Sequence, residues 1–473
     1  MPKASASKKK GAAAPSRGPT PAAAAAAAAT RARATGGAPY ERTGAEGGVV
    51  EYRLRANGMR LLVAEHRAAP VATFLVVYKV GSRNEAVGHT GATHLLEHML
   101  FKGTPRYDAK AGTAISATLH AVGAQYNATT WYDRTTYFET VPLERLPLAM
   151  DIESDRMRHS LLRDADRESE RIVVRNELER HQNEPESVLD EQLYAVAFRE
   201  HPYHHPTIGW RDDVEKVPTA RLRAFYDTFY YPDNATAVLV GDVDADAGAA
   251  LWAEHFGRVP PSGAAIPEVY TSEPPQQGER RFELRRPGEV SHVLVAYHIP
   301  AAAHDDTYPL AVLDAVLSGA VGSRVSTRFY RGLVDTGLAV RAYSNADQFR
   351  DPGLFKVAAT VRPGVRPAAV EEAVLEVLHR VAHEAVGDAE LGRAKRQLHA
   401  AYLYSREGTS GLAFELGESE ARADWRWYVG YPERLAAVKA ADLMRVAAKY
   451  FGRDNRTVGI FEPSAPAVQE TAS

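Results

Sequence analysis

The sequence predicts an α+β fold of two homologous domains, each a mostly antiparallel sheet packed with helices. The chain has 473 residues, which is more than one ordinary hydrophobic core accommodates. Segments with the alternation of strands and segments with the periodicity of helices follow one another along both halves. Two stretches of the first half also recur in the second half at nearly equal spacing. Length, periodicity and repetition therefore agree on a duplicated α+β unit.

The repeated stretches define the predicted domains. Phe229–Thr236 resembles Tyr450–Thr457, and Val71–Tyr78 resembles Val290–Tyr297, each pair lying about 220 residues apart. We therefore expect a first domain at 49–261 and a second at 281–463. Residues 262–280, rich in Pro, Gln and Ser, form the expected linker, and 464–473 a tail.

The first 48 residues predict a disordered tail, because lysine, proline, glycine and an alanine run cannot form a core. A secretory signal is an alternative, with Lys8 to Lys10 as its basic start and residues 31–34 as its cleavage site. Pro15, Pro19 and Pro21 interrupt that pattern. We expect an unprocessed tail and a cytoplasmic protein, and a periplasmic or secreted location stays open.

The elements of the first domain follow from local patterns. A strand begins near Val50 and turns at Asn57-Gly58, a strong hairpin signal. Further strand-like runs predict strands, and helical periodicity predicts helices, with Pro147 tolerated in a first turn. The predicted strands are 59–64, 71–80, two strands within 125–140 and 236–241, and the predicted helices surround 94–98 and span 113–122, 146–160, 166–184 and 222–230.

Composition narrows the function classes. Hydrophobic residues make up 45% and charged residues 25% of the chain, as in globular proteins. A formal charge of −3 gives no electrostatic reason to expect nucleic acid or an anionic membrane as partner. No stretch reaches the roughly 18 apolar residues of a membrane span. The chain has no cysteine, so a zinc site must use His and Asp or Glu.

The most informative motif is His94-Leu-Leu-Glu97-His98. Histidines four residues apart lie one turn apart on a helix, where both can bind one metal ion, and Glu97 shares that face. The order is that of the inverted zinc-protease motif. A solvated helix face is the competing interpretation. Neighbouring Leu, Met and Phe side chains argue against it, because they make the helix apolar and unpaired polar groups there are costly.

A catalytic zinc needs a third protein ligand and an open position for water. The best candidate is Glu177, and Glu170 lies two helical turns before it on the same face. Alternatively, Glu177 is an exposed residue paired with a nearby arginine, for which the candidates are Arg171, Arg175 and Arg180.

The motif and the helix Glu-Arg-x-Val-Val-x-x-Glu, about 75 to 80 residues later, together resemble the pitrilysin/insulinase family of inverted zinc metallopeptidases. The similarity covers about Val49 to Pro463 and is nearest to the zinc-bearing subunit of the mitochondrial-processing-peptidase-like branch. It implies one Zn²⁺ per chain held by His94, His98 and Glu177, with Glu97 as general base. Glu170 would be a carboxylate that supports a histidine ligand.

The resemblance also implies how substrate binds. Residues 123–129 resemble the family's edge strand, with Asn127 and Ala128 as the pair that contacts an added substrate strand. An internal strand is the equally open alternative. The histidines of the 201–206 segment, His201, His204 and His205, are not expected to bind a second metal, because prolines break their spacing.

The second domain lacks the metal motif, and it departs from the family pattern at two positions. It has residues 310–314, Leu-Ala-Val-Leu-Asp, in place of the metal motif, so no second metal is expected there. Many relatives complete the site with an arginine and a tyrosine, where this chain has Leu333 and Val340, which cannot donate hydrogen bonds to substrate. The resemblance therefore implies a partner, either a homologous subunit that supplies the Arg/Tyr pair or a second copy of the chain.

Together these features predict a zinc-dependent endopeptidase that hydrolyses peptides or unfolded segments by a metal-activated water. A non-catalytic scaffold subunit of a larger complex is the first alternative. A maturation protease dedicated to one peptide substrate is the second.

Overall fold

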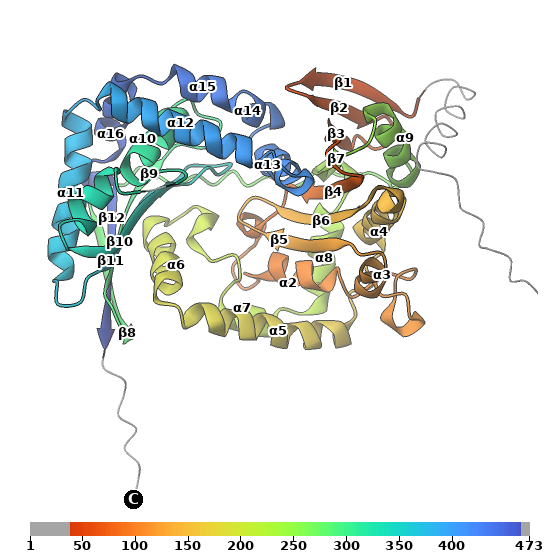
Figure 1. Ribbon diagram of the computed structural model, residues 1–473. Helices are drawn as coiled ribbons and strands as arrows, with labels where there is room; N and C mark the ends of the chain where they lie inside the picture. Colours follow the sequence, from red (N-terminus) through yellow and green to blue (C-terminus); the bar gives the residue numbers. More distant parts are fainter. Residues whose placement is uncertain (1–37, 323, 465–473) are drawn as a thin grey trace, which may run out of the picture.

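The computed structural model describes residues 38–322 and 324–464. Its strands form two sheets with helices on both faces (Figure 1). The first sheet has seven strands in the order β1-β2-β3-β7-β4-β6-β5, and its β3–β7 pair is parallel while the other pairs are antiparallel. The strands are β1 (Tyr40–Glu46), β2 (Val49–Leu54), β3 (Arg60–Glu65), β4 (Val71–Tyr78), β5 (Gln125–Thr130), β6 (Thr135–Pro142) and β7 (Ala235–Gly241).

The start of the folded chain differs from the prediction. The sequence predicts a disordered tail up to residue 48, but β1 occupies Tyr40–Glu46 and pairs with β2. Gly47 and Gly48 have φ angles of 56° and 84°, and they join Glu46 to its partner Val49. A two-residue hairpin of this kind needs left-handed backbone, which glycine adopts without strain. The rest of the predicted tails, residues 1–37 and 465–473, lies outside the described residues.

Helices of the first half surround its sheet. The helices predicted around 94–98 and at 113–122, 146–160, 166–184 and 222–230 are confirmed, with ends shifted by a few residues. Three further helices, α6, α7 and α9, were not predicted. The helices are α2 (Ala92–Met99), α3 (Ile115–Ala121), α4 (Leu146–His159), α5 (Asp164–Gln182), α6 (Pro185–Ala197), α7 (Arg211–Lys216), α8 (Thr219–Phe229) and α9 (Ala245–Phe256).

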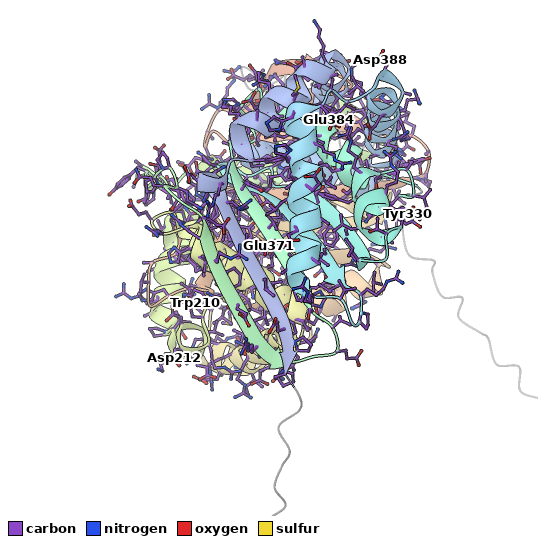
Figure 2. All side chains as sticks on the ribbon, turned by 90° about the vertical axis from the view of Figure 1, so that its left-hand side faces the viewer. Trp210, Asp212, Tyr330, Glu371, Glu384 and Asp388 are labelled. Atoms are coloured by element: carbon purple, nitrogen blue, oxygen red, sulfur yellow. The ribbon has the colours of Figure 1, made fainter. Side chains whose placement is uncertain are left out.

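The second sheet has five strands in the order β10-β11-β9-β12-β8, and its β12–β8 pair is parallel. The strands are β8 (Arg280–Pro287), β9 (His292–Ile299), β10 (Ala339–Ala346), β11 (Gly353–Val361) and β12 (Arg456–Ser464). Figure 2 shows α11 lying along the outer face of this sheet, with Glu371 and Glu384 near its two ends. The helices are α10 (Thr307–Ser318), α11 (Pro367–His383), α12 (Asp388–Tyr404), α13 (Thr409–Arg422), α14 (Trp425–Val429), α15 (Tyr431–Ala437) and α16 (Ala440–Tyr450).

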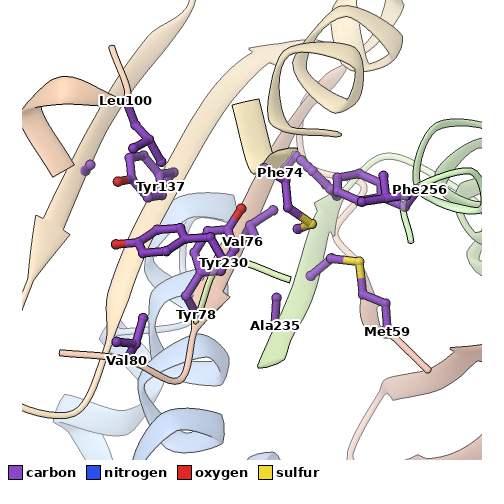
Figure 3. Close-up of a cluster of buried hydrophobic side chains, with 14 of the residues drawn as sticks. Met59, Phe74, Val76, Tyr78, Val80, Leu100, Tyr137, Tyr230, Ala235 and Phe256 are labelled. Atoms are coloured by element: carbon purple, nitrogen blue, oxygen red, sulfur yellow. The ribbon is translucent and has the colours of Figure 1, made fainter. Parts of the chain in front are cut away.

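Alternation along each strand sends side chains into two cores. Phe74, Val76 and Tyr78 of β4 pack with helices of the same half, and Figure 3 shows them beside Tyr137 and the neighbouring core side chains. Leu75 and Val77, on the opposite face, pack against α13 from the second half of the chain. The first sheet therefore buries both of its faces.

The two halves exchange one helix each. Helix α13 of the second half covers the first sheet, while α6 of the first half packs on β9, β8 and β12 of the second. Leu193 of α6 and Leu294 of β9 belong to one buried cluster, as do Leu416 of α13 and Leu75 of β4. Each sheet depends on the other half of the chain for one of its apolar covers.

The repeated segments occupy equivalent places. The first pair covers the end of α8 with the start of β7, and the end of α16 with the start of β12. The second pair is β4 and β9, and α10 follows β9 as α2 follows β4. Residues 257–279, which contain no helix or strand, connect the two halves. Among the described residues, no helix has the length and apolar character needed to cross a membrane.

Candidate metal centre

Two helices bring together the three predicted ligands. His94 and His98 lie on α2 and Glu177 on α5, and Figure 1 shows α2 between β5 and α5. The Nε2 atoms of both histidines lie 3.8 Å from Oε2 of Glu177. One ligand atom from each of the three residues falls within 4.8 Å of the others. Glu177 therefore faces the histidines, and Arg171, one of the arginines considered as its partner, pairs with Glu168.

The donor set fits zinc. Two imidazoles and one glutamate are ligands that catalytic zinc uses when no thiolate is available. Burial lowers the pKa of His94 to about 3, which keeps this imidazole neutral, as a metal ligand must be. Burial also disfavours a charge on His98, but its hydrogen bond with Glu170 and the carboxylates of Glu97 and Glu177 outweigh that effect and raise its pKa. Metal binding at neutral pH would then displace at most one proton from the two histidines.

Glu170 contacts the second histidine. Its Oε2 lies 3.2 Å from Nδ1 of His98, so that Nε2 of the same ring remains directed at Glu177. Lys102 forms an ion pair with the other oxygen of Glu170. Burial opposes the charge on Glu170, but the contacts with His98 and Lys102 lower its pKa. A carboxylate in this position fixes the tautomer and orientation of an imidazole ligand.

Glu97 lies beside the ligands and is held by the neighbouring strand. Glu97 is only 8% exposed. Thr130 at the end of β5 donates a hydrogen bond of 2.5 Å to Glu97 Oε2. Burial raises the pKa of Glu97, which the Thr130 hydroxyl partly opposes. A carboxyl group with a raised pKa is suited to accept and return a proton near neutral pH.

Strand β5 is an edge strand. It pairs with β6 on one side and stands last in the strand order. The alternative that this segment is an internal strand is therefore wrong. Asn127 is exposed and Ala128 is buried, as alternation along an edge strand requires. The free main-chain groups of an edge can pair with an extended peptide.

Several buried contacts fix the start of α2. Glu85 accepts hydrogen bonds from the backbone N–H groups of Gly91 (2.8 Å) and Thr93 (2.7 Å). Asp213 accepts hydrogen bonds from the backbone N–H and the hydroxyl of Thr90. Gly91 has φ +80°, and a Cβ at this residue would lie 2.4 Å from the carbonyl oxygen of Ile208. The helix that carries both histidines therefore begins at a tightly defined point.

Sequence reasoning missed Glu85 and Thr130. Neither residue has a spacing that relates it to the motif, because Glu85 lies in the preceding loop and Thr130 on another element. The turn residue Gly91 between Glu85 and the motif was the one local signal of a constrained helix start.

The three histidines of the 201–206 segment have other partners. His201 Nε2 lies 2.9 Å from Asp351 Oδ2, a contact between the two halves. His204 Nδ1 lies 3.0 Å from the His201 carbonyl oxygen. His205 Nδ1 lies 3.3 Å from the Pro206 carbonyl oxygen and 3.8 Å from Glu85 Oε2.

The second domain presents apolar side chains at the two positions singled out in the sequence. Leu333 is fully buried, while Val340 on β10 is 56% exposed. Neither side chain can donate a hydrogen bond. Helix α10, the counterpart of α2, is almost entirely buried and has Asp314 as its one acidic residue within the helix.

Comparison with known proteins agrees with this duplicated arrangement. Residues 60–210 match the family model described as insulinase (peptidase family M16), and residues 216–398 match the model described as peptidase M16 inactive domain. The chain is 31% identical over 390 residues to the zinc protease PqqE of Helicobacter pylori, covering 82% of this chain and 86% of that protein. It is 27% identical over 422 residues to the mitochondrial-processing peptidase subunit beta of Lentinula edodes, covering 85% and 88%.

Solved structures resemble the whole fold. The crystal structure of a protease from Helicobacter pylori matches with a TM-score of 0.83 at 28% identity, covering 90% of this chain and 99% of that one. A peptidase M16 inactive domain from Pseudomonas fluorescens matches with a TM-score of 0.78 at 17% identity, covering 88% and 98%. At that identity the likeness shows the fold alone. The similarities in sequence along both halves show that the chain belongs to the insulinase family, peptidase family M16.

Proposed function

We propose that this chain is a zinc-dependent endopeptidase in which His94, His98 and Glu177 hold the metal. The observation that carries the proposal is the meeting of these ligand atoms within 4.8 Å, with the buried Glu97 on the same helix. The similarity to the zinc protease PqqE of Helicobacter pylori supports the same chemistry.

Each residue has a distinct part in the proposed reaction. Zinc, when bound, polarises the scissile carbonyl and makes a water molecule more acidic. Glu97 accepts the proton of the attacking water and returns it to the leaving amine. Thr130 keeps the Glu97 carboxylate oriented through its hydrogen bond. Glu170 keeps the imidazole of His98 oriented toward the metal.

The same geometry suggests how a peptide binds. An extended segment would pair with the free edge of β5 near Asn127 and Ala128, which lie three and two residues before Thr130. Because Thr130 contacts Glu97, a peptide on this edge would have its carbonyl groups close to the base. Main-chain pairing makes few demands on side chains, so short or unfolded peptides are the expected substrates.

The decisive experiment is Glu97→Gln. Metal analysis is expected to find about one zinc per chain in both proteins, whereas peptide hydrolysis falls at least about a hundredfold in the variant. Glu179→Gln, an exposed carboxylate on α5, is the matched control and should leave both measurements unchanged. Undiminished turnover by Glu97→Gln would contradict the assignment. Absence of both zinc and hydrolysis in the wild-type protein would favour the scaffold alternative.

We further propose that full activity needs a second chain. Leu333 and Val340 cannot supply the hydrogen bonds that an Arg/Tyr pair would give to substrate. A homologous subunit or a second copy of the chain would provide such donors. High hydrolytic activity from a monomer saturated with zinc would exclude this requirement.

A further inference from the structure

Glu85 makes a buried contact that the proposed reaction does not use. Its side chain is completely buried, and its two oxygens accept hydrogen bonds from two different backbone N–H groups at the start of α2. Those groups belong to Gly91, which precedes the helix, and to Thr93, its second residue. The first N–H groups of a helix have no partner within the helix, and the two oxygens of Glu85 satisfy two such groups here.

The corresponding helix of the second domain begins differently. Asp306 precedes α10, and the structure gives it no side-chain hydrogen bond to the amides of that helix. The Asp306 carboxylate instead contacts Arg445, Lys449 and Tyr450. The two copies share a fold, yet of the two acidic side chains only Glu85, in the copy that carries the metal motif, accepts hydrogen bonds from backbone N–H groups at the start of the helix.

The contact lies next to a proposed ligand. His94 follows Thr93 directly, so the position of the Thr93 backbone determines where the His94 imidazole starts. His98 lies one turn further along and is fixed separately by Glu170. A rotation of the first turn would move His94 relative to His98 and Glu177, and would change the distances between the three ligand atoms. Burial of Glu85 beside His205 leaves the carboxylate little freedom to follow such a rotation.

We propose that Glu85 is a positioning residue of the metal centre, which sets the place of His94 by clamping the first turn of α2. This inference rests on the proposed metal function of His94, His98 and Glu177. Residues that orient metal ligands without touching the metal commonly change metal affinity by 10- to 100-fold when they are replaced.

The test is cobalt binding to Glu85→Gln in the full-length, metal-free protein. The amide side chain has nearly the same shape, but one of its ends is an N–H₂ group that cannot accept the hydrogen bond. We expect Co²⁺ to bind about tenfold more weakly than to the wild type, with an altered visible absorption spectrum. The matched control is Asp244→Asn, which removes a carboxylate that caps α9 by accepting a hydrogen bond from Ala247. This control should lose some thermal stability but bind Co²⁺ as the wild type does.

Each outcome decides the matter. If Glu85→Gln lowers the melting temperature but binds Co²⁺ with unchanged affinity and spectrum, Glu85 is a structural cap only and the inference is wrong. If Glu85→Gln does not fold, Glu85→Asp replaces it, since this variant keeps the carboxyl group on a side chain that is one methylene too short to reach both amides. Wild-type affinity in Glu85→Asp would then overturn the inference. A wild-type protein that binds no Co²⁺ would refute the proposed metal function itself, and the inference with it.

Discussion

At the scale of single residues, the pKa of Glu97 depends on the hydroxyl group of Thr130. Burial raises the pKa of Glu97, and the hydrogen bond from Thr130 acts in the opposite direction. Thr130→Val removes that hydrogen bond with little change in volume, so the pKa of Glu97 should rise further. A general base must be ionised to act, so the proposed activity of Glu97 is lost as the pH falls through its pKa. The acidic limb of the kcat/KM profile should therefore move to higher pH.

This shift is measured on the pH profile of peptide hydrolysis. Thr118→Val on α3 removes a hydroxyl group whose hydrogen bond is made at the surface, and it should leave the profile unchanged. An acidic limb that stays in place in Thr130→Val, or moves to lower pH, would show that Thr130 does not stabilise the ionised base.

Glu170 allows a second prediction about a single side chain. Glu170→Gln replaces the carboxylate that orients His98 and pairs with Lys102. We expect zinc to bind 10- to 100-fold more weakly, as measured by competition with a chelator. Glu179→Gln, on the same helix but exposed and paired with Arg211, should bind zinc normally. Equal affinities in the two variants would mean that Glu170 does not support the metal centre.

Which residues of the site could be predicted depends on how far along the chain they lie from the motif. His94, Glu97 and His98 share one helix, where spacing alone places them on one face. Glu177 lies on another helix, and spacing could not show that the two helices meet, so its selection needed the family resemblance. Glu85 and Thr130 act through hydrogen bonds from a loop and a strand, for which a single sequence has no periodic signal.

At the scale of helices and strands, the sequence predicted the elements with a clear pattern, but it did not predict which elements pack or pair with one another. Strands β2 to β7 are alternating or continuous apolar runs, and they appear where expected. The edge position of β5 was left open, since alternation describes the two faces of a strand and not its neighbours. The exchange of α6 and α13 was also invisible, because an amphipathic helix shows that it has an apolar face but not which sheet it covers.

Helix α13 should contribute strongly to the stability of a sheet that it follows by more than 150 residues. Leu416 is fully buried against β4, so Leu416→Ala removes apolar contacts and leaves a cavity. We expect the free energy of unfolding to fall by about 2–5 kcal/mol, measured by urea denaturation followed by circular dichroism. Leu403→Ala on α12, where the side chain is 51% exposed, should change it by less than about 0.5 kcal/mol. Similar effects of the two substitutions would show that α13 is only loosely attached.

At the scale of the whole molecule, the duplication seen in the sequence describes the architecture but not how strongly the two halves are held together. Two similar halves joined by residues 257–279 could behave as independent domains. Contacts between the halves argue otherwise: His201 bonds to Asp351, and the carboxylate of Glu418 on α13 pairs with Arg134 near the end of β5. The connection therefore combines exchanged apolar helices with polar contacts close to the proposed site.

The exchange predicts a single unfolding transition. If the first half unfolded alone, α6 would leave the second sheet and expose the cluster that contains Leu294; if the second half unfolded alone, α13 would expose Leu75. Each partial state would expose a large apolar face to water, which is costly in proportion to its area. Scanning calorimetry should therefore give one peak whose calorimetric and van't Hoff enthalpies agree. Leu416→Ala should move that peak to lower temperature without splitting it, although Leu416 belongs to the second half and packs on the first. Two separate peaks in the wild-type protein, or a variant in which one peak moves and another stays, would show that the halves fold independently despite the exchanged helices.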